Sequence, residues 1–250
     1  MRAGGSLDIW SYLVLIAVGT VAGFVNVMAG GGSLLTMPAM IFMGMSPATA
    51  NGTNRIALLA QNITSVSEFR RKGMADFRLS LTLGLCTLPG AVLGAVAAVR
   101  IDPLWFKRLL AVVMIGVLVV TIKNRKPGTG EGATHPRWAH LGMVGVGFYG
   151  GFIQAGVGFI FMALVRGLLH LDLVRTNMHK VFVIGMYMVP SLLVFVATGQ
   201  VRWLAGAVLA IGNSLGGWLA TWLQISRGEG VIRIVFAVAV VAMAIKLLLG

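Results

Sequence analysis

The chain has 250 residues, of which 58% are hydrophobic and only 11% are charged, whereas about 25% of an ordinary soluble domain is charged. A soluble fold of this length could not hide so much apolar surface, so the composition excludes soluble enzymes, disordered chains and collagen-like fibres, and indicates an integral membrane protein. The net charge of +13 comes mostly from Lys and Arg clusters between long uncharged runs, a pattern typical of polytopic membrane proteins rather than of nucleic-acid-binding proteins.

The first expected element is a membrane helix that begins near residue 9 and ends at the glycine triplet Gly30-Gly31-Gly32. No small-residue cleavage motif follows its apolar stretch, so we expect this helix to be retained and not removed as a signal peptide. A short half-helix over about 33–44 should follow, because Gly44 and Pro47 interrupt the next apolar run.

The later helices follow from uncharged runs that approach the length of about 20 residues needed to cross a membrane. Basic clusters at 70–78 and around the polar linker 123–137 contain eight Lys and Arg, against three at 100–108 between them, so we expect both clusters on the cytoplasmic side. The expected helices occupy 79–99, about 104–122, 138–165 with a glycine break inside it, 181–201, 203–226 and a last segment from Val231.

The segments 1–122 and 138–250 resemble two copies of one unit, joined by the polar cytoplasmic linker 123–137. Their matches keep the same order along the chain, which predicts an all-α fold of two homologous transmembrane repeats, each with a glycine-broken helix and a half-helix. The second copy is favoured to be inverted, because loop 226–233 carries one more Arg than loop 199–202. The matches are Ala29–Gly32 with Ala155–Gly158, Thr53-Asn54 with Thr176-Asn177, and Gly90/Gly94 with Gly212/Gly216.

The two glycine breaks are the first candidate binding site. Glycines at a helix break leave backbone amides uncovered, and consecutive amides beside a helix N-terminus attract anions. Broken helices in paired repeats form substrate sites in many transporters. The alternative is that glycine only allows close helix packing. The candidate residues are Gly30, Gly31, Gly32, Gly156 and Gly158.

Polar and basic residues about 20 positions after each break form the second candidate group. Hydroxyl and amide donors suit an oxyanion, and a nearby cation lowers the cost of dehydrating it. Arg55 stands alone in a long uncharged stretch, where a cation is costly unless it faces a cavity or a partner, although snorkelling to an interface is the alternative. The group consists of Thr53, Asn54 and Arg55 in the first copy, and of Thr176, Asn177 and Lys180 in the second.

Further polar residues are candidates for the pathway or for proton transfer, namely Asn26, Asn51, Gln61, Gln154 and His179, with Asn62 and Asn213 as other buried polar positions. All seven acidic residues fall at segment ends or in loops, and Cys86 is the single cysteine. We therefore expect no metal, no cofactor and no catalytic residue.

The order Gly23-Phe24, Gly30-Gly31-Gly32, Pro38 and Ala50-x-Gly52-Thr53 before a basic loop, repeated after a polar linker, resembles the TauE/SafE sulfite exporter family, also called the toluene-sulfonate uptake permease family. The resemblance covers residues 9–249. It implies transport of sulfite or another small sulfur-containing or organic anion across a bacterial inner membrane, and it matches the glycine breaks to glycine-rich stretches of the family. It does not assign Arg55, His179 or Lys180.

These observations predict a multi-pass transporter or exporter of sulfite or an organosulfonate that works by alternating access between two repeats. An anion channel is the alternative, as is a transporter of another organic anion such as a carboxylate. The expected partners are the anion, the lipid bilayer and a second copy of the chain in a homo-oligomer, with no nucleic acid. A membrane enzyme is disfavoured, because no clustered catalytic acids or metal ligands occur.

Overall fold

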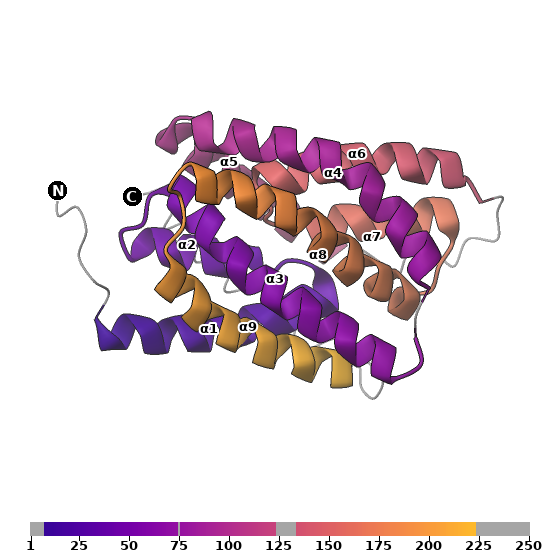
Figure 1. Ribbon diagram of the computed structural model, residues 1–250, viewed down its shortest axis with the longest axis horizontal. Helices are drawn as coiled ribbons and strands as arrows, with labels where there is room; N and C mark the ends of the chain where they lie inside the picture. The colour runs from indigo at the N-terminus through magenta and orange to yellow at the C-terminus, as the bar shows by residue number, and fades with distance from the viewer. Residues whose placement is uncertain (1–7, 75, 124–133, 224–250) are drawn as a thin grey trace.

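The computed structural model describes residues 8–74, 76–123 and 134–223, and every regular element within these ranges is an α-helix (Figure 1). In chain order the helices are α1 (Ile9–Ala29), α2 (Ser33–Phe42), α3 (Pro47–Arg71), α4 (Phe77–Arg100), α5 (Pro103–Lys123), α6 (Pro136–Phe152), α7 (Val157–Leu169), α8 (Leu173–Ala197) and α9 (Trp203–Leu223).

The starts of the two short helices differ from those of several longer helices. The starts of α1, α3, α4 and α8 each have a polar capping side chain that accepts a hydrogen bond from a backbone N–H of the first turn. The capping residues are Asp8, Ser46, Asp76 and Asp172. By contrast α2 and α7 follow Gly32 and Gly156, and neither has a side-chain cap. No side chain competes for the N-terminal turns of these two short helices, whose N–H groups at Leu34 and Val157 donate to the backbone carbonyls of Gly31 and Gln154.

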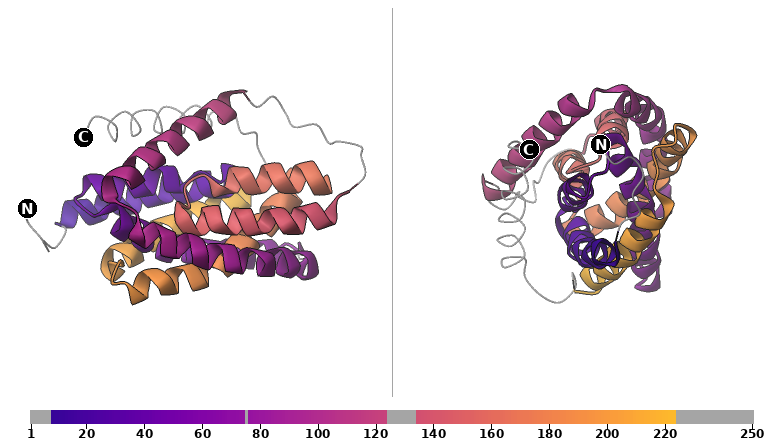
Figure 2. Two further views of the ribbon diagram at one scale, coloured as in Figure 1. Left: turned by 90° about the horizontal axis from the view of Figure 1, so that it is seen from above. Right: turned by 90° about the vertical axis from the view of Figure 1, so that its left-hand side faces the viewer.

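The helices form a flat bundle in which two close pairs flank a central pair. Figure 1 shows α4 with α6 along one edge, α1 with α9 along the opposite edge, and α3 and α8 between them. Helix α5 crosses the outside of this bundle obliquely (Figure 2). Its Phe106, Leu110 and Met114 are buried in the same hydrophobic cluster as Leu34 and Met37 of α2.

Glycines allow the two edge pairs to pack with their backbones in contact. On α6, Gly147 and Gly151 face the backbone of Thr87 and Ala91 of α4 so closely that neither position has space for a Cβ atom. The α1–α9 pair repeats this arrangement, with Gly212 and Gly216 of α9 against the backbone of Ile16 and Thr20 of α1. Both pairs run parallel. Small residues at such spacing are the usual means by which membrane helices approach closely.

Hydrogen bonds at the two ends of the bundle fix the directions of the helices. At one end, Lys72 Nζ after α3 donates to the carbonyl of Thr221 near the end of α9, 3.2 Å away. At the other end, Thr49 of α3 donates to Gln200, just before α9, at 2.8 Å. Helices α3 and α9 are therefore parallel. Helix α8 is antiparallel to α3, because Gly185 lies beside Asn62 while Gly52 lies beside Phe195.

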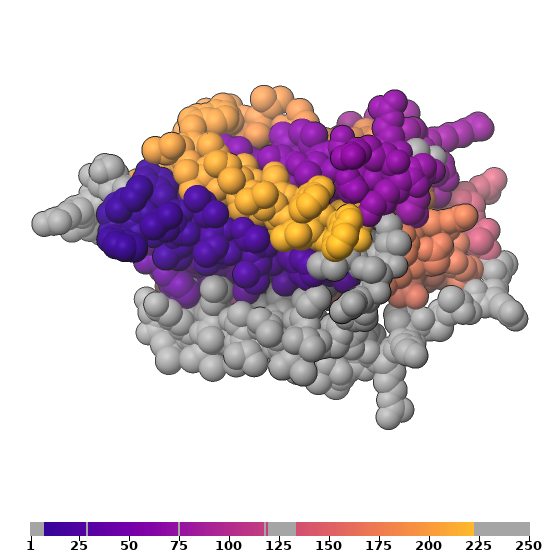
Figure 3. All heavy atoms as spheres, turned by 90° about the horizontal axis from the view of Figure 1, so that it is seen from below, coloured from indigo at the N-terminus to yellow at the C-terminus, as the bar shows by residue number. Residues whose placement is uncertain are grey.

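The surface of the bundle is apolar between two belts of tryptophan. Leu13, Val14, Ile211 and Leu215 are exposed on α1 and α9, which lie side by side along the face in Figure 3. All six tryptophans are exposed and stand near helix ends: Trp10, Trp105 and Trp203 at the start of α1, α5 and α9, and Trp138, Trp218 and Trp222 at the start of α6 and the end of α9. Tryptophan at both levels is typical of the two membrane interfaces. Among the described residues, the helices α1, α4, α8 and α9 are long and apolar enough to cross a bilayer.

The predicted glycine breaks and short helices are present. Helix α2 ends at Phe42, two residues before the expected limit, and the 138–165 run is divided into α6 and α7. The structure thus confirms an all-helical membrane fold. The predicted last helix from Val231 and loop 226–233 lie outside the described residues.

The packing of α6 on α4 gives a prediction with a matched control on the same helix. Gly147→Ala should lower the melting temperature, because its Cβ would collide with the Thr87 backbone, and overpacking typically costs about 1–3 kcal/mol. Gly145→Ala should not, because that position is exposed and open. Thermal unfolding of both purified variants tests this, and equal melting temperatures would contradict the observed helix contact.

Candidate functional site

The two glycine breaks meet inside the bundle. A Cβ atom on Gly30 would lie only 2.5 Å from Cα of Gly158, so the two backbones are in direct contact. Gly30 and Gly156 both adopt left-handed conformations, with φ of 84° and 74°. Only glycine adopts this conformation without strain. The backbone reverses direction at each glycine, so α2 and α7 both begin at this meeting point.

Two features of this meeting point suit an anion. The N-termini of α2 and α7, which no side chain caps, bring the partial positive charge of two helix dipoles to the same region. Gln154, in the turn between α6 and α7, is a buried non-glycine residue with φ of 62°, and its Oε1 accepts a hydrogen bond from Tyr187 Oη at 3.3 Å. Backbone strain in a buried residue is common at binding sites.

Lys180 of α8 is almost completely buried and contacts the C-terminal end of α1. Its Nζ donates to the carbonyl oxygens of Asn26 at 3.1 Å and Val27 at 2.9 Å. These carbonyls belong to the last turn before the first glycine break, where the helix dipole places partial negative charge. The ammonium group therefore binds the end of a helix that turns back inside the membrane.

Arg55 of α3 has an equivalent role at the end of α6. Its guanidinium donates to the carbonyls of Gly150 and Gly151, and it lies over the ring of Phe195 with 4.6 Å between Cζ and the ring centroid. The side chain has no exposed surface, so the snorkelling alternative is wrong. Asn51, one turn earlier on α3, donates to the carbonyl of Phe152 at 2.8 Å and so binds the same helix end.

Neither buried cation is paired with a carboxylate within the part of the chain that the structure describes. The ion pairs found there join Glu68 to Arg71 and Lys72, and Asp172 to Arg175, all near helix ends. A buried charge without a counter-ion is costly, and neutral carbonyls compensate it only in part. In the described chain both cations are thus compensated by neutral carbonyl groups and not by a counter-ion.

Two predicted pathway residues, Asn26 and Gln61, and the predicted substrate-binding residue Asn54 form two hydrogen-bonded groups. Asn26 of α1 donates to Gln61 of α3 at 3.1 Å, which links the Lys180 contact to α3. Asn54 of α3 accepts a hydrogen bond from Thr36 at 2.7 Å and donates to Ser33 at 3.2 Å, so its amide is bonded to both hydroxyls of α2.

Thr53, Thr176 and His179 have partners away from the breaks. The Thr53 hydroxyl accepts a hydrogen bond from the Arg202 N–H in the turn before α9. Thr176 donates to the carbonyl of Asp172 in its own helix at 2.7 Å. His179 Nδ1 lies 2.7 Å from Ser80 Oγ of α4. The site prediction for these three residues stays a prediction, with less geometric support than for the others.

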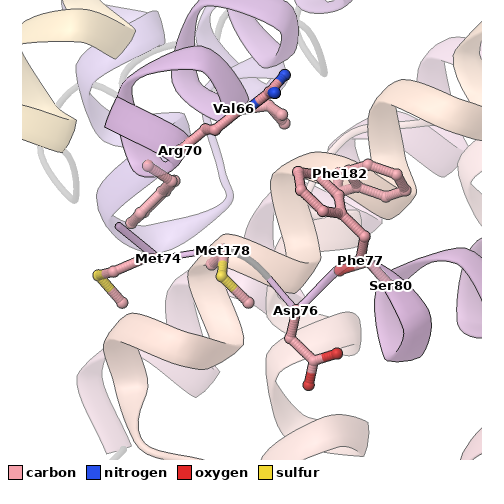
Figure 4. Close-up of a pocket in the computed structure, with 9 residues that line it drawn as sticks. Val66, Arg70, Met74, Asp76, Phe77, Ser80, Met178 and Phe182 are labelled. Atoms are coloured by element: carbon pink, nitrogen blue, oxygen red, sulfur yellow. The ribbon is translucent and has the colours of Figure 1, made fainter. Parts of the chain in front are cut away.

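A surface pocket lies near His179, at the end of the bundle that carries the 70–78 loop. Figure 4 shows Met74 and Met178 on one side of it and Phe77 and Phe182 on the other, with Asp76 pointing away from Phe182. The lining is mostly apolar, and it contains none of the glycine-break residues. The pocket is therefore distinct from the central candidate site.

Sequence reasoning missed several polar residues that the structure places in the site. Ser33 and Thr36 bind Asn54, and Ser65 is fully buried one turn after Gln61. The position of Ser33 could have indicated it, because this residue directly follows Gly32 at the start of the half-helix. Ser65 gave no such signal, because a single serine in a helix is an ordinary packing residue.

Several buried polar atoms have no hydrogen-bond partner in the described residues. They belong to α3, α8 and α9, and they are the Nε of Arg55, the Nε2 of Gln61, both amide atoms of Asn62 and of Asn177, the Oγ of Ser65 and the Oδ1 of Asn213. Such groups are uncommon in folded proteins, and each one needs an explanation such as a bound water or ligand. Within the same ranges, no three His, Cys, Asp or Glu side chains come close enough to hold a metal ion.

Comparisons with known proteins agree with this membrane architecture. Residues 15–247 match the model of the family described as "Sulfite exporter TauE/SafE". The chain is 28% identical over 241 residues to "Probable membrane transporter protein YfcA" of Escherichia coli K12, covering 94% of this chain and 88% of that protein. It is 28% identical over 239 residues to "Probable membrane transporter protein ORF9" of Sinorhizobium sp, covering 94% and 91%.

A "Probable membrane transporter protein" of Haemophilus influenzae is also 28% identical over 223 residues, which is 88% of each chain. No solved structure gave a significant match. The family model covers nearly the whole chain, and the relatives align along most of their length. The chain therefore belongs to the TauE/SafE sulfite exporter family, a family of multi-pass membrane transporters and not of enzymes.

Proposed function

We propose that this protein is a secondary transporter of a small anion, with sulfite or an organosulfonate as its substrate, in a bacterial inner membrane. The observation that carries the proposal is the pair of buried cations, Arg55 and Lys180, which bind helix-end carbonyls and no carboxylate of the described chain. The two glycine breaks meet each other inside the bundle and bring the N-termini of α2 and α7 together.

The two halves of the chain are inverted repeats in this proposal. Helices α1 to α4 correspond to α6 to α9, and the equivalent helices α3 and α8 run in opposite directions. Helix α1 packs on α9 as α6 packs on α4, which is the arrangement that a two-fold axis in the membrane plane would produce. Inverted repeats of this kind place the substrate site where the two halves meet.

Alternating access would follow from the way each cation links the two halves. Arg55 in the first half holds the end of α6 in the second, whereas Lys180 in the second half holds the end of α1 in the first. An anion forms stronger, charge-assisted hydrogen bonds with either cation than a neutral carbonyl does. Anion binding can therefore release one helix end while the other contact stays closed.

The membrane potential favours export. An inside-negative potential supplies about 2.3 kcal/mol per charge per 100 mV to an anion that leaves the cell. The 70–78 loop would face the cytoplasm, since its end of the bundle also carries Arg137, Arg166 and Arg175. No coupling carboxylate is required for this direction of transport.

The first prediction separates a transporter from an anion channel. Proteoliposomes that contain the purified protein and are loaded with unlabelled sulfite should accumulate labelled sulfite by counterflow, because one site alternates between the two sides. The initial rate should saturate with external sulfite. Flux that follows the gradient without exchange or saturation would favour the channel, and absence of flux for sulfite, sulfonates and carboxylates would contradict the proposal.

The second prediction concerns Arg55. Losing a hydrogen bond to a charged group typically costs about 1.5–3 kcal/mol, which corresponds to roughly 10- to 150-fold in affinity. Arg55→Gln should raise the half-saturating sulfite concentration by about that factor, while its amide can still donate to one carbonyl of α6. Arg55→Lys should recover part of the loss, since it restores the charge without the planar fork of donors.

The folded fraction of each Arg55 variant is checked by size-exclusion chromatography and thermal unfolding. A well-folded Arg55→Gln protein with wild-type transport kinetics would show that this guanidinium only holds α6 in place.

A further inference from the structure

The unpaired polar atoms are concentrated on one stretch of α3 and on the facing helices. Gln61, Asn62 and Ser65 occupy a little more than one turn of α3, and all three are buried. A Cβ atom on Gly217 of α9 would contact both Gln61 Cγ and Ser65 Oγ, while Asn62 lies beside Gly185 of α8. The unpaired groups of α3 therefore face two helices at the same level of the bundle.

Lys180 of α8 is connected to this stretch of α3 through Asn26, and Asn177 lies one turn before Lys180 on α8. They are separated by three residues, so they lie on the same face of the helix. Lys180 donates to the carbonyl of Asn26, and the Asn26 side chain donates to Gln61. A single residue, Asn26, therefore links the ammonium group to the α3 stretch. Two of the three N–H bonds of Lys180 have carbonyl acceptors in the described chain, which leaves the third for a ligand.

Asn177 differs from its counterpart in the first repeat in a way that points to a ligand. In the proposed repeat alignment Asn177 corresponds to Asn54, whose amide is fully bonded to Ser33 and Thr36 of the half-helix. The matching positions of α7 are Phe159 and Met162, which cannot provide hydroxyl groups. Both amide atoms of Asn177 are consequently buried without a partner in the described residues.

We propose that Lys180, Asn177, Asn62 and Gln61 form a binding site for a small oxyanion, located in the cytoplasmic half of the bundle, on the inner side of the glycine breaks. This inference rests on the proposed transport function and assigns the substrate a position within it. The site offers one cation, three amide N–H₂ groups and the Ser65 hydroxyl, and no acidic side chain belongs to the group. Such a donor-rich set with a single positive charge matches sulfite or a sulfonate.

The two buried cations have different surroundings. The Arg55 guanidinium is surrounded by the carbonyls of Gly150 and Gly151, the Asn51 amide oxygen and the Phe195 ring, with only its Nε unpaired. Lys180 instead stands beside several unpaired amides. We assign the resting anion site to Lys180, whereas Arg55 engages the anion only after α6 has moved away.

The test compares three variants of the full-length protein in detergent, with sulfite titrated by isothermal calorimetry and methanesulfonate as the second probe. Asn177→Leu and Asn62→Leu should each weaken sulfite binding at least 10-fold. Neither should lower the melting temperature of the protein without ligand, because an apolar group of similar size replaces a polar group that has no partner. Asn54→Leu is the matched control, and it should lower that melting temperature because it removes two buried hydrogen bonds.

Wild-type affinity in both Asn177→Leu and Asn62→Leu would overturn this inference, and so would a fall in the unliganded melting temperature of Asn177→Leu that equals the fall for Asn54→Leu. If wild-type protein exchanges sulfite in proteoliposomes while these variants still bind it normally, the site assignment fails and the transport function stands. Wild-type protein that neither binds nor exchanges any of the oxyanions would overturn both.

Discussion

The hydrogen bonds between two buried cations and the carbonyl ends of two helices are the interactions on which the rest of the structure depends. Lys180 binds the end of α1 and Arg55 binds the end of α6, and each contact joins one half of the chain to the other. Burial of a charge is expensive, so the cations stabilise this fold only while the helix ends stay in position. The glycine breaks make that position accessible, because α1 ends at Ala29 and α6 at Phe152, so the carbonyls of their last turns point past the helix ends toward the two cations.

The same interactions connect stability to transport. A carbonyl is a partner that a stronger anion can replace, whereas a carboxylate bound to Lys180 or Arg55 would hold its cation permanently. The absence of such carboxylates among the described residues is therefore consistent with a cation kept for a substrate. The unpaired amides near Lys180 add a second cost that a bound oxyanion would remove, since buried polar groups without partners destabilise the unliganded state. Binding energy can thus be used to shift the equilibrium between conformations that differ in which helix end is released.

Much of the fold could be predicted from the sequence, because membrane spans and their interruptions depend on local composition. Gly30–Gly32 and Gly156–Gly158 marked the end of α1 and the start of α7, and the uncharged surroundings of Arg55 indicated a cation buried inside the bundle. The partners of that cation could not be predicted, because Gly150 and Gly151 approach it only through the tertiary packing of α6 on α4 and α8. Thr53 and Thr176 looked like ligand donors, yet threonine near a helix start commonly bonds to nearby backbone instead, as Thr176 does. Asn62 and Asn177 are distinguished from packing residues only by the absence of partners in the structure.

The central claim is that both buried cations are available to one anionic substrate, and thermal unfolding of the purified protein in the presence of anions tests it most directly. A ligand that binds the folded state raises its apparent stability, by about 2.7 kcal/mol at a hundredfold excess over Kd. We expect sulfite or a sulfonate to raise the melting temperature in a saturable way, with chloride at equal ionic strength having little effect, and we expect the Arg55→Gln/Lys180→Gln double variant to lose this response. An equal rise for every salt, or a response to sulfite that persists in the folded double variant, would contradict the account.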